Sequence, residues 1–428
     1  MFEGNPYYKK LDDNLALKSV SSMEDVERLM VFHLLVFKDE PSVARLLRAL
    51  ILHHPYTKPE YFLFIEDEST KTIVSSLCLI PWIIDFKGIE LRSAEMGIVG
   101  TLREYRKRGL IRVLHKRFHE LAVKENFDMT QIEGIPYFYK QFGYEYAIPL
   151  EPSYILDLNL IPETLSKEQQ EYQFRKATME DIPKLVELYS IMTDNLEIKS
   201  LRSEEVWEYI LGPSQDFDPT LEVWLVLDKN QHISGYFRAT QEGFSEGLIL
   251  NEAIYFSDDI ASAMLKKLKE LCLKHEKPYL RFNNHQDNLL VKVGKSLGAK
   301  DLGHYAWQIY FFDKTQFLNK IKSILEQRIL DSPFKGLTET IFIDMYHESI
   351  ELKIEKGEIK EIKMIESQGE TSHFRVPPNL IVPFFLGYRD REELIKYNHD
   401  VRCLQERKWE KLIDTLFPKM KSFLYLNF

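Results

Sequence analysis

The chain has 428 residues, of which 44% are hydrophobic and 29% are charged. This length predicts about three domains, and the composition is that of a globular protein rather than a collagen-like, coiled-coil or low-complexity chain. With 66 acidic and 56 basic residues, the net charge is −10, which argues against a general nucleic-acid-binding protein. An acidic field favours cationic ligands such as amines, and plain solubility is the alternative reason for it.

The spacing of the cysteines and the lengths of the apolar runs bear on metal binding, disulfide bonds and cellular location. Cys78, Cys272 and Cys403 lie far apart and form no CxxC pair, so neither a zinc site nor a disulfide framework is expected. The polar stretch 1–14 lacks the apolar core of a signal peptide, and no run of 18 apolar residues predicts a transmembrane helix. We therefore expect a cytoplasmic protein without a metal.

Two segments of the chain share one pattern. Residues 17–26 and 174–182 each read as a strand, then Ser/Thr-Met-Glu-Asp, then a helix, with Ser22 and Thr178 as N-caps. Similar elements follow in the same order in both halves, which indicates a duplication rather than a chance repeat. These elements are hairpins at 61–79 and 223–237, long amphipathic helices at 110–125 and 260–274, and helix exits at Gly143 and Gly298.

A third region begins near Asp313 and does not repeat the first two. It reads as a helix at 314–327, three strands within 339–365, a helix-like run at 378–385 and a polar helix after Asp390. The polar segment 163–173 is the expected linker between the two similar halves. We therefore predict three domains, at residues 1–165, 166–312 and 313–428.

The segment 93–114 carries the clearest chemistry. A strand ends near Thr101, a basic turn follows, and a helix begins at once. Such a strand, turn and helix predict an anion site, because helix N-terminal amides and the helix dipole favour negative charge. Gly109 lets the backbone approach a ligand closely. The side chains that add charge-assisted donors are Arg106, Lys107 and Arg108.

The expected ligand of this turn is a phosphate or pyrophosphate. By spacing alone, a solvated basic helix start is an equal alternative. Neither a Walker A loop nor a Rossmann GxGxxG fingerprint is present.

Two motifs resemble those of the GNAT acetyltransferases. Residues 104–111 resemble the acetyl-CoA signature Arg/Gln-x-x-Gly-x-Gly/Ala, with Arg106 and Gly109 matching and Ile111 in place of the second small residue. Residues 138–144, Phe-Tyr-Lys-Gln-Phe-Gly-Tyr, resemble the family's Phe-Tyr pair and the short helix that ends in Phe-Gly-Phe/Tyr. The two motifs lie about 30 residues apart, as they do in the family.

The whole-chain plan resembles the enhanced intracellular survival (Eis) acetyltransferases. This resemblance implies an α/β (α+β) fold with a catalytic GNAT domain, a degenerate second GNAT domain and a third domain similar to sterol carrier proteins. In the second half, Asp258 and Asp259 stand where the basic turn should be, so no cofactor is expected there. The resemblance also suggests a hexamer.

The resemblance implies direct transfer of an acetyl group from acetyl-CoA to an aminoglycoside-, polyamine- or lysine-like amine. Tyr139 is the expected general acid, with core packing as its alternative role. The terminal carboxylate of Phe428 is the expected base, with a merely docked tail as the alternative. The expected cofactor-binding residues are Ile98, Val99, Gly100, Thr101, Arg106, Lys107, Arg108, Gly109, Leu110 and Ile111.

Other interpretations stay open. His115 and His119 have the i, i+4 spacing of a metal pair, but a partly exposed helix face is the expectation because no third ligand is near. Tyr137 and Tyr144 are expected to be packing residues. A non-catalytic acyl-CoA or lipid-binding protein, and a transferase of a longer acyl group such as an N-myristoyltransferase, are the alternative functions.

Overall fold

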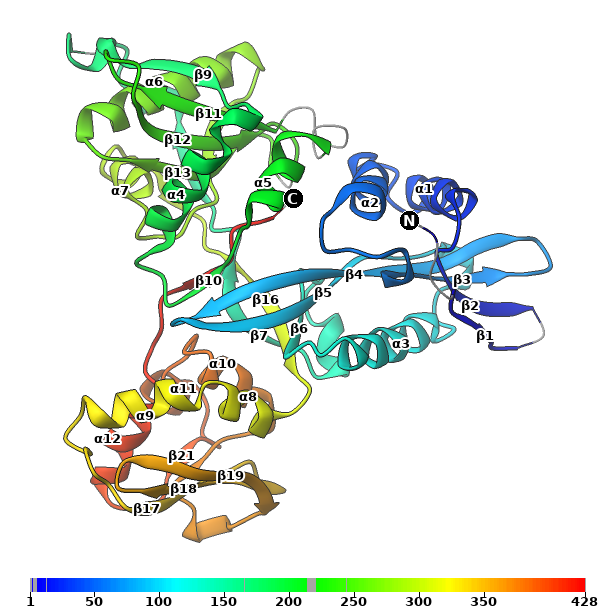
Figure 1. Cartoon of the computed structure of the whole chain (residues 1–428), viewed down its shortest axis with the longest axis vertical. Helices are drawn as coiled ribbons and strands as arrows, with labels where there is room; N and C mark the ends of the chain where they lie inside the picture. Colours follow the sequence, from blue (N-terminus) through cyan, green and yellow to red (C-terminus); the bar gives the residue numbers. More distant parts are fainter. Residues whose placement is uncertain are drawn as a thin grey trace.

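The computed structural model describes residues 2, 6–12, 14–164, 166–213, 221–243 and 245–427. These residues form three lobes, each built on its own β-sheet (Figure 1). The predicted fold class, α/β with a mixed sheet in the first two lobes and an α+β third lobe, is confirmed. No helix of the described residues is long and apolar enough to cross a membrane.

The first lobe contains the strand, basic turn and helix singled out above. Its sheet has the order β1-β2-β3-β4-β5-β6-β16-β7, and β10 and β22 extend it at the far end of β4. The strands are β1 (Tyr8–Lys10), β2 (Leu15–Ser19), β3 (Phe62–Asp67), β4 (Thr72–Phe86), β5 (Ile89–Thr101), β6 (Met129–Ile132), β16 (Tyr305–Phe311), β7 (Glu145–Leu150), β10 (Ile198–Ser200) and β22 (Ser422–Phe423).

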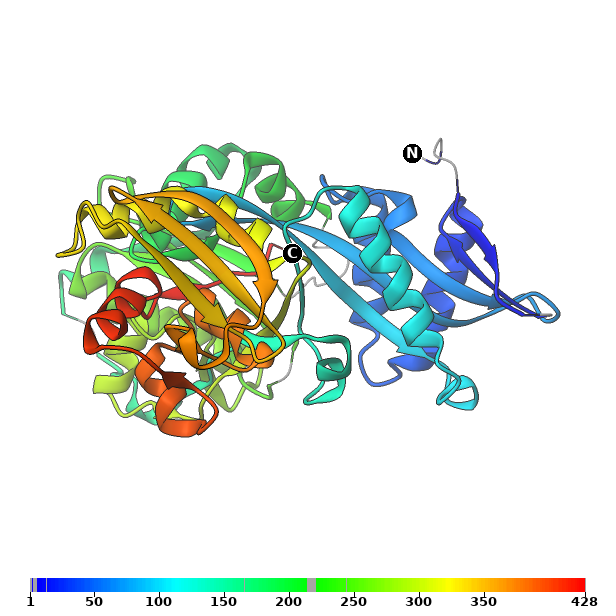
Figure 2. The ribbon, with the colours of Figure 1, turned by 90° about the horizontal axis from the view of Figure 1, so that it is seen from below.

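Helices cover both faces of this sheet. Helices α1 (Met23–Val36) and α2 (Ser42–His53) lie on one face, and α3 (Leu110–Lys124) crosses the other (Figure 2). Ser22 caps α1 as predicted, because its Oγ accepts a hydrogen bond from the Asp25 amide at 3.2 Å. The apolar stripe that predicted α3 is buried against the sheet; it consists of Leu110, Leu114, Phe118 and Leu121.

The second lobe repeats the strand order of the first. Its sheet has the order β9-β11-β12-β13-β14-β8-β15. Strands β13 and β14 are parallel and are connected by a helix, as β5 and β6 are in the first lobe. The strands are β9 (Gln173–Lys176), β11 (Glu222–Leu227), β12 (Ile233–Thr240), β13 (Leu248–Tyr255), β14 (Tyr279–Phe282), β8 (Tyr154–Asp157) and β15 (Lys300–Asp301). The helices are α4 (Ile182–Thr193), α5 (Glu204–Leu211), α6 (Asp258–Lys274) and α7 (Leu289–Ser296).

The two sheets exchange strands. Strand β8 comes from the first half of the chain but pairs with β14 of the second sheet, and β16 comes from the second half but lies between β6 and β7 of the first. The predicted linker 163–173 therefore connects two strands of the second sheet, β8 and β9. The domain limits stay a prediction, since boundaries drawn along the sequence leave β8 of the second sheet in the first unit. They also leave β10 and β16 of the first sheet in the second unit, and β22 in the third.

The third lobe has a five-stranded sheet in the order β19-β18-β17-β20-β21. Its strands are β17 (Glu339–Asp344), β18 (Glu348–Glu355), β19 (Glu358–Glu366), β20 (Phe374–Arg375) and β21 (Arg402–Cys403). Its helices are α8 (Lys314–Lys320), α9 (Lys322–Leu330), α10 (Ile381–Phe385), α11 (Arg391–Tyr397) and α12 (Arg407–Leu416). The helix predicted at 314–327 is divided at Ile321, where α8 ends and α9 begins.

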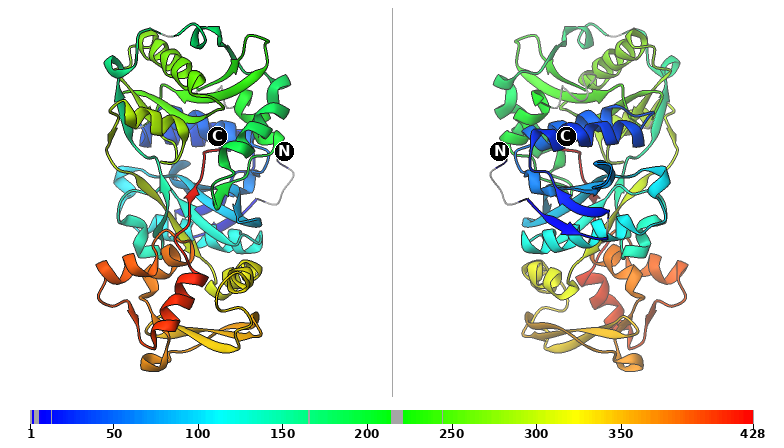
Figure 3. Two further views of the ribbon diagram at one scale, coloured as in Figure 1. Left: turned by 90° about the vertical axis from the view of Figure 1, so that its left-hand side faces the viewer. Right: turned by 90° about the vertical axis from the view of Figure 1, so that its right-hand side faces the viewer.

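After the third lobe, the chain returns to the other two. The C-terminal segment runs up from α12 toward the second lobe (Figure 3), and β22 pairs in parallel with β10. Strand β10 pairs with the end of β4, so three distant parts of the chain meet at this point. The C-terminal residues are thereby brought close to both of the first two sheets.

Candidate active site

The candidate site begins where β5 and β6 separate. The two strands pair in parallel only from Ser93–Met129 to Glu95–Gln131, while β5 continues along β4 to Thr101. Ile98 has a φ of +48°, which is unusual for a β-branched residue, and the register between β4 and β5 shifts beside it. The separation leaves backbone groups at the end of β5 unpaired on the β6 side, where a ligand can bond them.

A cavity of about 730 Å³ extends from this opening to the start of α3. Its apolar wall contains Ile135, Phe138 and Phe142. Eight of the ten expected cofactor-binding residues line it: Val99, Gly100, Thr101, Arg106, Lys107, Gly109, Leu110 and Ile111. An elongated ligand with an anionic end and an apolar arm matches this lining.

Two expected cofactor-binding residues lie outside the cavity lining. Ile98 is half-buried and packs on the hydrophobic core. The guanidinium of Arg108 lies 5.1 Å above the ring of Tyr105, and Arg108 lines a neighbouring groove instead. Because φ turns positive at Lys107, at +63°, successive side chains of this turn diverge, and sequence spacing does not reveal which ones face the cavity.

The start of α3 is open toward the cavity. Gly109 has a φ of +75° and is the N-cap residue, and no side chain caps the helix. Its carbonyl accepts bonds from the amides of Arg112 and Val113, so the preceding amides of the turn stay available for an anion. Nothing in the protein lies within 4 Å of a Cβ built at Gly109, so the positive φ, rather than crowding, is what the glycine provides here.

Tyr139 lies at the inner end of the cavity on η3 (Phe138–Phe142), and only 5% of its surface is exposed. Burial raises the pKa of Tyr139 well above its usual value of 10.0, so the phenol stays protonated at neutral pH. Within the described part of the chain, its hydroxyl has no hydrogen-bond partner. A protonated hydroxyl without a partner, on a side chain that lines the cavity, can donate to a developing anion.

The neighbouring tyrosines differ from one another. Tyr144 is fully buried, as expected of a packing residue, and bonds Thr130 at 2.9 Å. Tyr137 is 79% exposed, so the expectation that it packs in the interior is wrong. Tyr137 has a φ of +68° and turns the chain into η3, which points its side chain outward.

His115 and His119 form a tilted ring contact rather than an exposed face. Their ring centroids are 4.1 Å apart, and His115 also stacks on Phe142. His115 is buried, contrary to the expectation, while His119 is half-buried. Burial lowers the pKa of His115 to about 4 and of His119 to about 3, so both are neutral at pH 7. Among the described residues, no cluster of three potential metal ligands occurs.

Three carboxyl groups that the sequence analysis missed lie near one another, and one of them precedes Gly134, the residue that lies against the Tyr139 ring; we name Glu95, Glu133 and Glu151 the acidic cluster. Glu133 follows β6, and part of its surface is exposed. Loss of water around its carboxyl group and the charges of Glu151 and Glu95 together raise its pKa to about 8, against the lowering effect of Arg281. This pKa places Glu133 where a carboxyl group can exchange a proton near neutral pH.

The other two carboxyl groups of the cluster each contact one neighbouring side chain. Burial raises the pKa of Glu95 to about 7, and its Oε2 accepts a bond from Trp82 Nε1 at 2.7 Å. Glu151 lies 3.5 Å from Arg281 and lines a small cavity with Asn283, whose buried Oδ1 has no partner among the described residues. The sequence held no spacing signal for this cluster, since it unites the middle of β5 with the residues that follow β6 and β7.

Residue Phe428 lies outside the described residues, so the expected role of its carboxylate stays a prediction. The segment up to Asn427 is firmly held. The carbonyl of Leu426 accepts bonds from Arg202 at 2.8 Å and Arg238 at 2.7 Å, and both arginines contact buried Glu252. The tail is therefore a buried part of the structure between the first two lobes.

The corresponding place in the second lobe has no basic turn. Ser257 precedes α6, and Asp258 and Asp259 occupy its first turn. Gln169 Nε2 donates to Asp259 at 3.3 Å, and the hydroxyl of Tyr172 lies 3.4 Å from that of Ser257. Carboxylates and neighbouring side chains thus fill the position that an anion would need.

The first lobe, which holds the cavity, matches a known domain by sequence. A family profile described as an acetyltransferase (GNAT) domain matches residues 20–147. The chain therefore contains a GNAT acetyltransferase domain and is an acyltransferase, which confirms the predicted family and enzyme class. By sequence, no curated protein matches it.

Solved structures share the fold over nearly the whole chain. A probable N-acyltransferase from Enterococcus faecalis is 14% identical with a TM-score of 0.70, and the match covers 97% of this chain and 99% of that one. Eis1 from Mycobacterium abscessus is 13% identical with a TM-score of 0.62, over 97% and 100% of the two chains. The resemblance to Eis is thereby confirmed at the level of the fold.

A second kind of acyltransferase shares part of the fold. The N-myristoyltransferase of Saccharomyces cerevisiae, solved with bound myristoyl-CoA, is 14% identical with a TM-score of 0.53. The match covers 71% of this chain and 84% of that one. At sequence identities of 13–14%, the similarity to these solved structures is a similarity of fold.

Proposed function

We propose that the protein transfers an acetyl group from acetyl-CoA directly to a primary amine of a small cationic molecule or a lysine side chain. The observation that carries the proposal is the cavity of about 730 Å³ that is lined both by the open start of α3 and by Tyr139. The diphosphate binds the amides of the turn and Arg106, and the pantetheine arm runs along the end of β5. The thioester then lies beside Tyr139.

The acidic cluster supports a cationic acceptor. Glu95, Glu133 and Glu151 lie near one another, with Arg281 as the facing cation, and the free acceptor oxygen of Asn283 adds a further negative dipole. An approaching ammonium group favours the ionised forms of these carboxyl groups, whose raised pKa values reflect burial without a sufficient counter-charge. The donor end of the cavity is basic instead, so the amine is expected to bind on the side of the acidic cluster.

The reaction balances with these residues. The neutral amine nitrogen attacks the thioester carbonyl carbon, the carbon–sulfur bond breaks, and the thiolate takes a proton from Tyr139. Glu133 accepts the proton that the amine nitrogen loses, directly or through one water. Solvent then returns a proton to Tyr139 and takes one from Glu133.

Glu133 and the terminal carboxylate of Phe428 are two candidates for the base. We favour Glu133 because of its raised pKa and because it directly precedes Gly134, which contacts the Tyr139 ring. The carboxylate of Phe428 rests on the Eis resemblance and on the anchored tail. A matched pair of variants described below separates the two.

Acyl length, acceptor identity and stoichiometry are tested together. Release of free thiol is measured with acyl-CoA donors of increasing length and a panel of polyamines, aminoglycosides and lysine peptides. The proposal expects amine-dependent release that is fastest with acetyl-CoA, and calorimetry should give one CoA per chain. Faster turnover of myristoyl-CoA would replace the acetyl assignment, and binding without turnover would favour a non-catalytic acyl-CoA-binding protein.

A further inference from the structure

A second basic groove lies on the other side of α3. It has a volume of about 480 Å³ and runs between β1 and the first three turns of α3. Its only acidic lining residue among those described is Glu120. Its cationic lining residues are Lys9, Lys10, Arg108, Arg112, Lys116 and Arg117.

Most of these cations lack a counter-ion. Arg117 lies 3.4 Å from Glu120 and 3.8 Å above the ring of Tyr7. Its charge is therefore already paired within the protein. Within the described part of the chain, Lys9, Lys10 and Lys116 form no ion pair. In a chain with a net charge of −10, unpaired cations converging on one groove repel each other unless an anion joins them.

The groove adjoins the cofactor cavity. Gly109 and Arg112 line both spaces, so the two meet at the start of α3. At 1.5 Å per residue, Lys116 lies about 10 Å from Gly109 along the helix axis. A ligand with its diphosphate at Gly109 can therefore extend a second anionic group toward Lys116.

We propose that this groove binds the phosphate on the ribose of the CoA nucleotide, apart from the diphosphate site. The inference rests on the proposed use of a CoA thioester. Lys9 and Lys10 belong to β1, outside the residues 20–147 that match the GNAT domain. Five of the six cationic lining residues remain beside the Arg117–Glu120 pair, and a groove of about 480 Å³ suits a compact phosphate better than an extended acidic protein surface.

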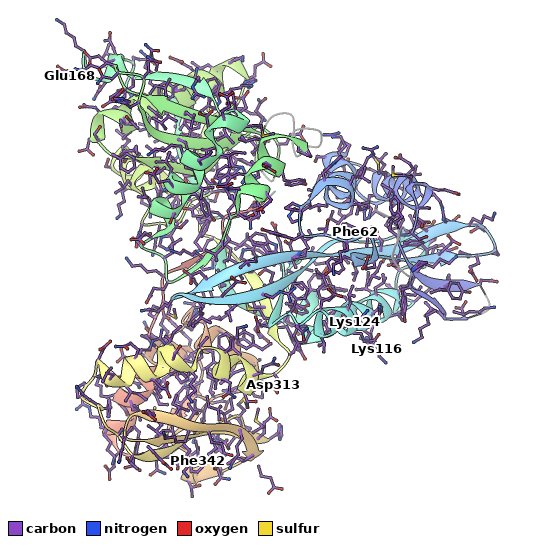
Figure 4. All side chains as sticks on the ribbon, viewed as in Figure 1. Phe62, Lys116, Lys124, Glu168, Asp313 and Phe342 are labelled. Carbon is purple, nitrogen blue, oxygen red and sulfur yellow. The ribbon has the colours of Figure 1, made fainter. Side chains whose placement is uncertain are left out.

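The test compares CoA with 3′-dephospho-CoA by calorimetry on the full chain. We expect the parent to bind CoA about tenfold more tightly, as for a phosphate with charge-assisted hydrogen bonds. Lys116→Gln should reduce this ratio to about threefold, and Lys10→Gln with Lys116→Gln should bring it near one. Lys124→Gln is the matched control, because Lys124 is exposed on the same helix outside the groove (Figure 4).

Three outcomes overturn the proposal. They are a parent that binds both ligands equally, a ratio that Lys116→Gln leaves unchanged, and a ratio that Lys124→Gln lowers as much as Lys116→Gln does. Equal weakening of both ligands by Lys116→Gln is one form of the second outcome, and it would mean that the groove acts on the diphosphate. The calorimetric assay measures binding and not turnover. A protein that fails to transfer acetyl groups can therefore still show the expected preference for CoA over 3′-dephospho-CoA, and the two failures are distinguishable.

Discussion

The ring of Tyr139 lies against Gly134: a Cβ built at Gly134 would come within 2.3 Å of Tyr139 Cδ2. The carbonyl of Gly134 also accepts a bond from Gln308 Nε2 at 2.9 Å, and Gln308 belongs to the exchanged strand β16. The second half of the chain thus holds the backbone on which Tyr139 rests. Because Glu133 is the preceding residue, the same contact brings the proposed acid close to the proposed base.

Removing the hydroxyl of Tyr139 tests the proposed acid. Tyr139→Phe should lower kcat by about 10²–10⁴-fold, as for loss of a general acid. Its acetyl-CoA Kd and thermal stability should change little, since the hydroxyl has no hydrogen-bond partner in the described structure. Steady-state kinetics measures kcat, and calorimetry measures the Kd. Turnover within about twofold of the parent would remove Tyr139 from the mechanism.

The turn before α3 can be tested against a matched glycine. Gly109→Ala places a side chain at a φ of +75°, which costs about 1–2 kcal/mol for an L-residue and disturbs the amides that face the diphosphate. Gly88→Ala imposes a similar strain at a φ of +89° in the β4–β5 turn, away from the cavity. Both should lower Tm, but only Gly109→Ala should raise the acetyl-CoA Kd, by about tenfold or more. An unchanged Kd in folded Gly109→Ala would contradict the anion site.

Glu133→Gln tests the proposed base. Glu133 accepts a proton only when ionised, so with a pKa of about 8 its contribution should rise with pH up to about 8 and then level off. The parent-to-variant ratio of kcat/KM cancels the acceptor's own titration and should follow this curve, reaching about 10²-fold. A ratio near one at every pH would exclude Glu133.

The terminal carboxylate is tested by adding two alanines after Phe428. If Glu133 is the base, this extension should leave kcat within a few-fold of the parent while acetyl-CoA binding and Tm are unchanged. A sharp loss of kcat on extension, together with normal kcat in Glu133→Gln, would assign the base to Phe428 instead.

Glu95 should make the fold less stable as pH rises. Its pKa is raised from 4.5 to about 7, so the folded state holds its proton more tightly than the unfolded state does. Below pH 4.5 the carboxyl is neutral in both states; between 4.5 and 7 the unfolded state ionises first, and stability falls by about 3 kcal/mol. Glu95→Gln keeps an acceptor for Trp82 and should flatten this slope in denaturant titrations. An equally steep slope in the variant would refute the assignment.

The sequence predicted the elements well where local chemistry decides them. Ser22 predicted the start of α1 as its N-cap residue. The basic residues and the glycine before Leu110 predicted the start of α3. It did not predict the strand exchange, because β8 and β16 are chosen by pairing with distant strands rather than by their own patterns. The acidic cluster was missed for the same reason: Glu133 and Glu151 come together only after the sheets assemble.

The most direct test of the account is thiol release from acetyl-CoA by the parent and Tyr139→Phe, each with and without a polyamine, with the acylated product identified by mass spectrometry. We predict amine-dependent release in the parent, an N-acetylated product in equal amount, and loss of at least about 99% of the rate in Tyr139→Phe. Release that is independent of amine, or identical in parent and variant, would contradict the proposed acetyl transfer at this site.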